Sequence, residues 1–356
     1  VGGECPYFGC IPSKMIVRAA DLLAEGRRIP GMAGESSVTA DWSPVASRIS
    51  EEATDDWDDT VAVQRLEKAG VTFVRGHGRL TGRREVEVDG RSFVARKGVV
   101  LNTGTEPAVP PIDGLADTPY WTNRDAVRLD NLPGSLIVIG GGAIGAELAQ
   151  GFSRFGVKVT VLENAPQILA IEEPESGKVV AEAFGREGIQ VLAGVETSRI
   201  LYDDGQFTLE VGEQTLHAEK LLVTTGRSTN LSDIGLDTVG LDPDAPSIEV
   251  DERMRAAEGL WAIGDITGKG AFTHMSMYQA DVAVRDLLDR DGPAADYRAV
   301  SRVTFTDPEV GSVGLTERAA RDAGVDVETV EYDMAALAGT YVLREDYTGR
   351  AKLVVD

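Results

Sequence analysis

Cysteine and histidine are scarce in this chain, which limits the kinds of site it can build. Its 356 residues include 2 cysteines and 3 histidines, His77, His217 and His274. A structural zinc site needs about four Cys or His ligands at short spacing, so we expect no metal site. Secreted disulfide scaffolds are rich in cysteine, and no secretory signal is recognisable in the sequence. We therefore expect a cytoplasmic protein, in which a disulfide that persists would have a catalytic role.

Long apolar runs and basic charge are also lacking. No stretch approaches the ~18 consecutive apolar residues of a transmembrane helix. Lys and Arg number 35 against 58 Asp and Glu, and the resulting net charge of −23 would repel nucleic acids and anionic membranes. We therefore expect neither nucleic acid nor a membrane as a partner. An apolar content of 42% with 40 Gly is typical of an α/β protein, and the length allows two or three domains.

The two cysteines lie near the start, in Cys5-Pro6-Tyr7-Phe8-Gly9-Cys10. In one regular α-helix, a rise of ~1.5 Å per residue would hold their Cα atoms more than ~7 Å apart, too far for a disulfide. A break in the helix is therefore predicted, with Cys10 at the start of a helix whose positive end favours a thiolate. Lys14 adds a cation nearby. The pattern predicts a redox-active pair, with a purely structural disulfide as the alternative.

A second motif lies near the middle of the chain. The apolar segment 135–139 predicts a buried strand that leads into Gly140-Gly141-Gly142-Ala143-Ile144-Gly145, a G-x-G-x-x-G sequence. A predicted helix over 146–155 and a predicted strand over 157–162 follow. Together they form a βαβ unit of the kind that binds a dinucleotide. A tight strand-to-helix turn without a ligand is the alternative.

Each glycine of this motif has a physical role. Gly140 permits the tight turn, Gly142 lets a pyrophosphate approach the backbone at the helix N-terminus, and Gly145 allows the helix to pack closely on the strand. Glu163 lies 18 residues after Gly145, where a carboxylate accepts hydrogen bonds from a ribose 2′-hydroxyl and repels a 2′-phosphate. We therefore predict that NADH is preferred over NADPH. For Glu163 a solvated strand end is the alternative.

Further strands end in small or acidic residues. The apolar segments 99–101 and 221–224 both lead into Thr-Gly, which suggests a duplicated architecture that brings one strand end to each ligand crevice. A predicted strand over 260–263 leads into Gly264-Asp265, which would place a carboxylate at a cofactor crevice, with an Asx turn as the alternative. Between these motifs the sequence predicts a helix over 176–187, a strand over 189–192, a β-meander over 197–225, a helix over 274–288 and a helix capped by Thr316.

Assembled along the chain, these motifs resemble the class I pyridine nucleotide-disulfide oxidoreductases, the flavoenzyme family of dihydrolipoamide dehydrogenase, glutathione reductase and mercuric reductase. Gly2-Gly3-Glu4-Cys5 with the segment 9–14 is similar to the redox signature of the family. The segments 102–104 and 264–265 are similar to its flavin motifs, with Asn102 in place of the usual Ala, and 303–310 is similar to the opening strand of its dimer-interface domain. The resemblance implies an α/β fold with two Rossmann-like dinucleotide-binding domains, for FAD and NAD, and a partial α+β dimer-interface domain.

The resemblance also implies roles for individual residues. Cys5 would be the interchange thiol that meets the substrate, and Cys10 the thiolate in contact with the flavin. Lys14 would form a buried pair with Glu147, which otherwise would be read as a solvated helix carboxylate. Gly78, otherwise a turn glycine, would make a backbone contact to FAD. The implied contacts to FAD and NAD are Lys14, Gly78, Thr103, Gly104, Gly140, Gly142, Ala143, Ile144, Gly145, Glu163, Gly226, Gly264, Asp265, Ala271, Phe272, Thr273 and His274.

The family pattern divides the chain into parts. We expect a first FAD-binding part over 1–114, an NAD-binding domain over 115–247, a second FAD-binding part over 248–298 and a dimerisation domain over 299–356. The family begins with its own βαβ unit for FAD and ends with a His-Pro and Glu element that supplies a base. Neither is present in the sequence, which predicts that the chain is part of a longer protein. A homodimer is implied for that protein.

The implied activity is the transfer of electrons between NADH and a substrate disulfide or dithiol, through FAD and a Cys5–Cys10 disulfide, as in dihydrolipoamide dehydrogenase. The Pro6-Tyr7-Phe8 spacer departs from the Asn-containing spacer common in the family. A mercuric reductase-like activity or another NAD(P)H-dependent disulfide or quinone reductase activity therefore stays open. A non-catalytic remnant that binds a nucleotide is an alternative of a different class.

Overall fold

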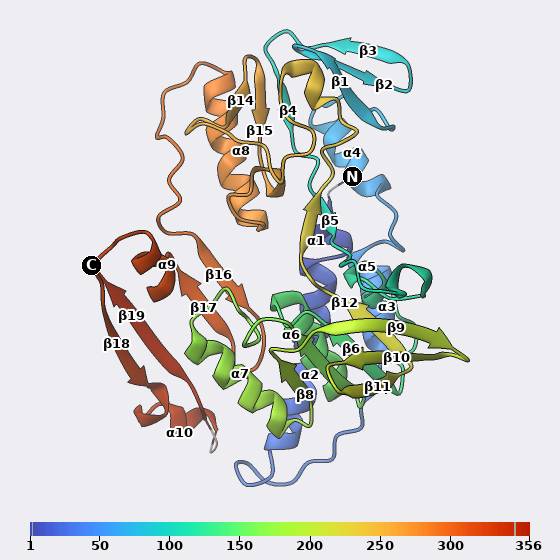
Figure 1. Cartoon of the computed structure of the whole chain (residues 1–356), viewed down its shortest axis with the longest axis vertical. Coiled ribbons are helices and arrows are strands. Elements are labelled where there is room, and N and C mark those ends of the chain that lie inside the picture. The colour runs from blue at the N-terminus through green and yellow to red at the C-terminus, as the bar shows by residue number, and fades with distance from the viewer. Residues whose placement is uncertain (2, 345–346) are drawn as a thin grey trace. The chain divides into compact units, whose positions relative to one another are not determined.

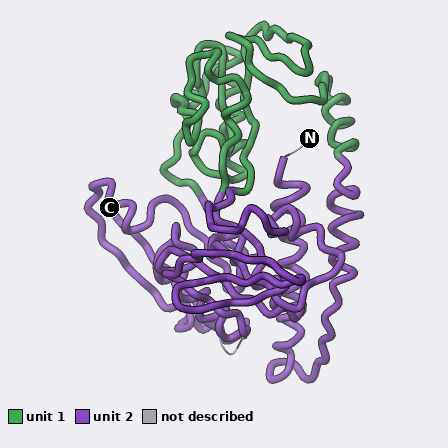
Figure 2. The backbone as a smooth tube through the Cα atoms, turned by 45° about the vertical axis from the view of Figure 1, so that its right-hand side comes forward, with its two compact units in different colours: residues 1, 59–107, 227–300 green, residues 2–58, 108–226, 301–356 purple. Residues whose placement is uncertain are grey.

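The computed structural model of this protein describes residues 1, 3–344 and 347–356. Gly2, which belongs to the predicted redox signature, lies outside the described residues. The chain forms two compact units, each made of separated segments (Figure 2). Unit 1 contains residues 1, 59–107 and 227–300, and unit 2 contains residues 2–58, 108–226 and 301–356. The chain therefore passes between the units several times, and motifs distant in sequence share one unit.

Unit 2 is built on a parallel four-stranded sheet with the order β12-β6-β7-β8 (Figure 1). Its strands are β6 (Ser135–Ile139), β7 (Lys158–Glu163), β8 (Gln190–Ala193) and β12 (Lys220–Val223). The last four positions of β6 are apolar and buried, as expected of a parallel strand that is covered on both faces. Leu136 and Val138 enter one hydrophobic core, while Ile137 and Ile139 enter another.

Helices cover one face of this sheet and a β-meander covers the other (Figure 1). The helical core joins Ile16 of α2 (Cys10–Arg28), Phe152 of α6 (Ala143–Arg154) and Phe184 of α7 (Pro174–Arg186). The meander core contains Phe207 and Leu209, and the meander consists of β9 (Thr197–Asp203), β10 (Gln206–Val211) and β11 (Gln214–Ala218). The sheet is thus the middle of three layers, and the carboxyl end of β6 opens onto the start of α6.

Short elements complete unit 2. Four of them precede or flank the sheet: α1 (Glu4–Tyr7), α3 (Ser43–Ser47), the π-helix η1 (Arg48–Ala53) and α5 (Asn123–Ala126). The C-terminal segment contains β16 (Ser301–Thr304), β17 (Val310–Val313), α9 (Glu317–Asp322), β18 (Glu328–Asp333), α10 (Thr340–Leu343) and β19 (Arg350–Val355). The pairs β16–β17 and β18–β19 are antiparallel. Lys352 of β19 forms ion pairs with Glu173 at 3.0 Å and Glu317 at 2.9 Å, which fasten this hairpin to the starts of α7 and α9.

Unit 1 contains three small sheets. One is the antiparallel sheet of β1 (Gly78–Gly82), β2 (Glu85–Val88) and β3 (Arg91–Val94). The second has the order β14-β15-β4 and consists of β14 (Arg255–Ala257), β15 (Leu260–Ala262) and β4 (Val99–Leu101). The third pairs β5 (Thr105–Pro107) with β13 (Arg227–Thr229). The helices α4 (Thr60–Lys68) and α8 (Thr273–Leu287) complete the unit.

The predicted duplication has a structural counterpart. In unit 2 the strand before Thr224 and Gly226, β12, runs parallel to β6, which leads into Gly140. In unit 1 the strand before Thr103 and Gly104, β4, runs parallel to β15, which leads into Gly264. Each unit thus places a Thr-Gly strand end beside a glycine turn, and the predicted α/β fold class is confirmed.

One predicted boundary was wrong. The helix after the glycine motif begins at Ala143 and not at Ala146, because Gly142 is its N-cap and Gly145 lies in its first turn. The predicted β-meander and the Thr316 cap of α9, whose hydroxyl accepts the Ala319 N–H at 3.2 Å, are confirmed. Among the residues that the structure describes, no helix is long and apolar enough to cross a membrane.

Candidate functional site

The segment 4–10, called here the redox turn, breaks the helix between the two cysteines. Cys5 lies in α1, which ends at Tyr7, and Cys10 is the first residue of α2. Gly9 is the N-cap of α2, and a Cβ at this position would lie 3.2 Å from the Glu4 carbonyl oxygen and 3.5 Å from the Cys5 Cα. The chain at Gly9 therefore packs directly on the backbone of Cys5. Cys5 is half-buried and Cys10 is exposed, so the break and the helix start predicted for these residues are confirmed.

Lys14 and Glu147 form an ion pair at 2.6 Å between Nζ and Oε2. Lys14 lies one turn beyond Cys10 on α2, and Glu147 lies on α6. The other carboxylate oxygen of Glu147 accepts the Phe305 N–H at 2.9 Å, and the Lys14 ammonium lies 4.6 Å from the centre of the Phe305 ring. The Glu147 side chain is 5% exposed but that of Lys14 is 37% exposed. The expected burial of the pair is therefore correct for the carboxylate and wrong for the ammonium.

The glycine motif has the geometry of a nucleotide loop. Gly140 has a φ of +102°, and a Cβ there would lie 2.5 Å from the Thr224 carbonyl oxygen. A Cβ at Gly145 would lie 2.0 Å from the Gly140 carbonyl oxygen, so only glycine allows α6 to approach β6. A Cβ at Gly142 would meet no atom within 4 Å. Gly142 therefore borders open space at the positive end of α6, a feature typical of loops that bind a pyrophosphate.

The residues around this loop hold it in place. Ala143 and Ile144, the first two residues of α6, are exposed and present their backbone to the same open space. The Glu163 carboxylate accepts the Gly141 N–H at 2.7 Å and the Ala165 N–H at 2.9 Å. Its position is thus set by backbone groups on both sides of the crevice. The Thr224 hydroxyl, two residues before Gly226, donates to the Gly140 carbonyl at 2.8 Å.

In unit 1, Asp265 follows β15 on a glycine turn. Gly264 has a φ of +79°, and a Cβ there would lie 2.6 Å from the Asn102 Oδ1, so the two strand ends touch. The Asp265 carboxylate accepts the Thr105 hydroxyl at 3.1 Å. Arg227 in turn donates to the Thr105 hydroxyl at 2.9 Å and to its carbonyl at 2.6 Å. These contacts fix the carboxylate that the sequence assigned to the flavin.

The remaining predicted flavin contacts also lie at turns and helix starts of unit 1. Gly78 is the first residue of β1, Gly104 has a φ of +68°, and Thr103 is the second residue after the end of β4. Phe272 is the N-cap of α8, and its ring stacks on His274 at 5.3 Å. Ala271, Thr273 and His274 are exposed. Their predicted roles stay predictions.

Within each unit the structure brings some predicted residues together. In unit 2 it joins Lys14 to Glu147, and it joins Glu163 to the glycine loop. In unit 1 it sets Asp265 and Gly264 beside the end of β4. The redox turn belongs to unit 2 and the Asp265 turn to unit 1.

Sequence reasoning missed several residues that support these sites. Gln279 is fully buried in α8, accepts the Gly264 N–H at 2.6 Å and donates to the Thr267 hydroxyl at 3.2 Å. A lone amide on the apolar face of the helix predicted over 274–288 was a usable signal. Phe305 beside Lys14 carried no such signal, because only long-range packing brings it to α2.

Comparison with known proteins agrees with this arrangement of a redox turn, a glycine loop and a Gly-Asp turn. Residues 1–286 match the family described as pyridine nucleotide-disulphide oxidoreductase, and residues 300–356 match its dimerisation domain. The chain belongs to the pyridine nucleotide-disulphide oxidoreductase family. Members of this family use FAD and NAD(P)H.

Individual relatives come from more than one branch of the family. A mercuric reductase of Shigella flexneri is 34% identical over 100% of this chain and 65% of its own length. A dihydrolipoyl dehydrogenase of Chlorobaculum tepidum is 32% identical over 100% of this chain and 78% of its own length. The HOCl-induced flavoprotein disulfide reductase RclA from Escherichia coli superposes with a TM-score of 0.84 at 27% identity, over 100% of this chain and 78% of that chain.

The chain is shorter than these relatives. It spans 61% of the mercuric reductase of Acidithiobacillus ferrooxidans, to which it is 33% identical, and 65% of that of Shigella flexneri.

Proposed function

We propose that this protein is an FAD-dependent oxidoreductase that passes electrons between NADH and a substrate disulfide or dithiol through a Cys5–Cys10 disulfide. The observation that carries the proposal is the break between α1 and α2, which packs Gly9 on Cys5 and sets Lys14 one helical turn beyond Cys10. A helix N-terminus and a nearby cation both favour the thiolate, which is the reactive form of cysteine. The family match supports the same activity.

The chain's own residues have distinct tasks in this proposal. Cys5, which is half-buried, exchanges with the substrate: its thiolate attacks a substrate disulfide, one substrate thiol leaves, and Cys10 then attacks Cys5 to release the second. Two electrons have then left the cysteine pair, and its disulfide has formed. Bound FAD would supply the two-electron carrier that reduces this disulfide again. Lys14, held by Glu147 and Phe305, would keep a positive charge one helical turn from Cys10.

Residues in each unit are suited to hold the cofactors. For FAD we propose Asp265, which Thr105 and Arg227 fix, together with Gly78 and Gly104 of the same unit. NADH is proposed to bind at the glycine loop of unit 2, because Gly142 borders open space in front of the positive end of α6. The Glu163 carboxylate, fixed by the Gly141 and Ala165 N–H groups, supports the preference for NADH over NADPH.

The proposed substrate class is a disulfide or dithiol, as for dihydrolipoyl dehydrogenase. A metal-ion substrate is the second candidate, because several similar proteins are mercuric reductases.

We also propose the domain boundaries predicted from the sequence and a cytoplasmic location. The scarcity of cysteine supports the location.

We further propose a homodimer, which the dimerisation-domain match over 300–356 supports. The β18–β19 hairpin presents Val330 and Leu353, which are paired in register and 59% and 64% exposed, on one face. A second copy could cover these apolar side chains. Equilibrium sedimentation of the full-length protein checks the assembly, and a monomer at micromolar concentration would rule it out.

The redox assignment is tested by replacing Cys10→Ser in the flavin-loaded protein. We expect loss of the long-wavelength absorbance band that a thiolate next to an oxidised flavin produces on two-electron reduction. Cys5→Ser is the matched variant: Cys10 cannot form the disulfide there, so its thiolate should give the band before any reduction, and substrate turnover should be lost. A band that survives in Cys10→Ser contradicts the assignment. A purified full-length protein without flavin absorbance, and with the same thiol titre before and after NADH, would favour the non-catalytic alternative.

A further inference from the structure

The turn between the two cysteines is held by side chains that are distant in sequence. Asn123, the first residue of α5, is 6% exposed, and its Nδ2 donates to the Phe8 carbonyl at 2.8 Å and to the Glu4 carboxylate at 3.1 Å. Arg124 donates to the other Glu4 oxygen at 2.6 Å. The Trp57 indole N–H donates to the Tyr7 carbonyl at 3.1 Å. The redox turn is therefore fastened by outside donors at its start, Glu4, and in its middle, Tyr7 and Phe8.

Arginine side chains also contact the aromatic rings of Phe8 and Trp57 at this turn. The Arg128 guanidinium lies 4.7 Å from the centre of the Phe8 ring and 5.0 Å from that of Trp57, and Arg124 lies 5.6 Å from the Phe8 ring. Phe8 and Trp57 both pack against the helical core of unit 2. The Tyr7-Phe8 spacer differs from the spacer common in the family. In this chain Trp57 contacts Tyr7, and Arg124 and Arg128 contact Phe8.

An unusual backbone brings Trp57 to this position. Asp55, Asp56 and Trp57 have φ values of 53°, 56° and 59°, a left-handed run that costs about 1–2 kcal/mol per residue for side chains other than glycine. The run follows the π-helix η1, which is itself rare. Such strain persists only where the surroundings hold it, and it gathers at functional sites.

The surroundings of Trp57 do hold this run. The Asp56 N–H donates to the Ser50 carbonyl at 2.8 Å, and the Trp57 N–H donates to the Thr54 hydroxyl at 3.3 Å. Thr54 is 1% exposed, and its hydroxyl lies 3.0 Å from the carbonyls of Ile49 and Ser50. These hydrogen bonds therefore fix the backbone that carries the Trp57 indole, which contacts the redox turn.

We propose that Asn123 and Trp57 are positioning residues for the cysteine pair, and that they favour its disulfide by restricting the redox turn. This inference rests on the proposed function. In the dithiol form an unrestrained turn would let Cys5 move away from Cys10, whereas the fastened turn keeps each thiol close to the other. Holding reacting groups together raises their effective concentration, so the intramolecular disulfide becomes harder to reduce.

The test is an equilibrium with glutathione. One Cys5–Cys10 disulfide and two glutathione thiols give two cysteine thiols and one glutathione disulfide, a transfer of two electrons and two protons. The full chain is equilibrated at graded ratios of reduced to oxidised glutathione, quenched with acid and alkylated. Mass spectrometry then measures the reduced and oxidised fractions of the peptide that contains both cysteines. Asn123→Ala removes the donor to Phe8 and Glu4, and Trp57→Phe removes the donor to Tyr7 while keeping an aromatic ring.

We expect the equilibrium constant for reduction to rise about two- to tenfold in Trp57→Phe, the range that one lost hydrogen bond supplies, and at least as much in Asn123→Ala, which loses two. Tenfold corresponds to about 30 mV for this two-electron couple. The control for Trp57→Phe is Trp42→Phe, because the Trp42 indole also donates to a backbone carbonyl, that of Leu129 at 2.7 Å. The control for Asn123→Ala is Asn131→Ala at an exposed position. Both controls should stay within twofold of the wild type.

The outcomes separate this inference from the proposed function. A wild-type chain that forms no Cys5–Cys10 disulfide at any glutathione ratio contradicts the proposed function. A wild-type disulfide whose equilibrium is unchanged in both variants overturns the role of Asn123 and Trp57 alone. An equal shift in Trp42→Phe also overturns it, because the shift would then report a general loss of stability. If Asn123→Ala does not fold, the comparison of Trp57→Phe with Trp42→Phe decides.

Discussion

The Glu163 carboxylate is held in position by two backbone hydrogen bonds. Its two carboxylate oxygens each accept one backbone N–H, from Gly141 before the crevice and from Ala165 after it. A carboxylate oxygen has two lone pairs, so each oxygen keeps capacity for a ribose hydroxyl. The negative charge that suits the hydroxyl disfavours a 2′-phosphate at the same point.

We expect Glu163→Gln to lower the ratio of NADH to NADPH affinity about tenfold, because the charge that repels the 2′-phosphate is removed. Isothermal titration with both nucleotides measures this ratio. Glu182→Gln, at an exposed position of α7, changes the net charge equally and should leave the ratio unchanged. An unaltered ratio in Glu163→Gln would assign Glu163 to loop structure alone.

At the scale of elements, the junction between β6 and α6 needs close packing at one glycine and open space at another. Close packing of helix on strand requires that no side chain project from Gly145, whose Cβ would meet the Gly140 carbonyl at 2.0 Å. Ligand approach requires open space in front of the helix N-terminus, and Gly142 borders such space. The same residue type therefore serves folding at Gly145 and, in the proposed function, ligand binding at Gly142.

Two alanine substitutions separate these roles. Gly145→Ala should destabilise the fold by about 1–3 kcal/mol, because the methyl group overlaps backbone that cannot yield cheaply. Gly142→Ala should change stability by less than about 1 kcal/mol, the cost of a poorer N-cap, yet weaken NADH binding about tenfold or more. Thermal unfolding and fluorescence titration with NADH measure the two effects. Equal losses of stability in both variants would contradict this division.

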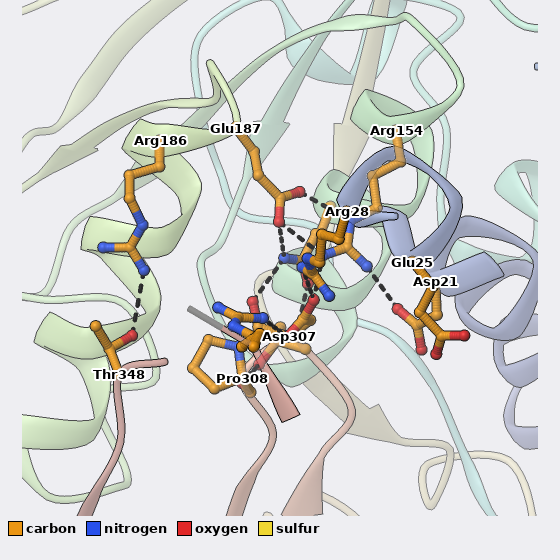
Figure 3. A network of polar contacts seen from close by, with 12 residues as sticks. Asp21, Glu25, Arg28, Arg154, Arg186, Glu187, Asp307, Pro308 and Thr348 are labelled. Carbon is orange, nitrogen blue, oxygen red and sulfur yellow. Dashed lines mark hydrogen bonds and ion pairs between the residues drawn. The ribbon is translucent and has the colours of Figure 1, made fainter. Parts of the chain in front are cut away.

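Lys14 and two further charged residues lie along one side of α2, and these two belong to a cluster of charged side chains. Asp21 and Arg28 follow at intervals of seven residues, which places them along one side of the helix. Asp21 accepts from the buried Arg154 of α6 at 2.5 Å, and Arg28 pairs with Asp307 of the C-terminal segment (Figure 3). The helix that begins at Cys10 is thus tied along its length to elements from elsewhere in unit 2.

On the scale of the whole molecule, this cluster joins three distant parts of the sequence within unit 2. Arg154 contacts Asp307 at 2.7 Å and Glu187 at 2.6 Å (Figure 3). Arg344 contacts Asp307 at 3.1 Å. Burial acts to raise the pKa of Asp307, but hydrogen bonds from Arg28 and Arg154 and their positive charges outweigh it and lower the pKa to about 2. For Asp21, burial dominates and raises the pKa.

The low pKa of Asp307 predicts acid lability. Because its folded pKa lies below the unfolded value of about 3.9, Asp307 contributes stability above about pH 4 that is lost as the pH falls towards about 2. The contribution is on the order of 2 kcal/mol. Asp21 acts in the opposite direction: its raised pKa costs stability at neutral pH, and protonation in acid relieves that cost.

Asp307→Asn should therefore lower the free energy of unfolding by about 2–4 kcal/mol at pH 7, because Arg154 and Arg28 each lose a charged partner, while Arg154 keeps its ion pairs with Glu187 and Asp21. The deficit relative to wild type should shrink between about pH 4 and about pH 2. Urea unfolding at several pH values measures it, and Asp130→Asn at an exposed position is the control. A deficit that is constant with pH would show that Asp307 acts through packing and not through its charge.

Much of this architecture could be read from local sequence. The strand 135–139 matches β6 residue for residue, and the glycine loop, the Thr316 cap and the break between the cysteines follow from preferences of a few adjacent residues. The pairing of Lys14 with Glu147 was expected only through the family resemblance, since 133 residues separate them. The start of α6 was misplaced by three residues because a glycine-rich N-cap carries little helix signal.

Local residue preferences and motif spacing were thus sufficient to predict the α/β class, the two glycine turns and the break between the cysteines, because each depends on backbone conformations that neighbouring residues set. The partners of the redox turn, Asn123 and Trp57, and the partners of Asp265, Thr105 and Arg227, became visible only in the folded chain. Their contacts join segments far apart in sequence, and the packing of whole elements, which no local pattern encodes, brings them within hydrogen-bonding distance.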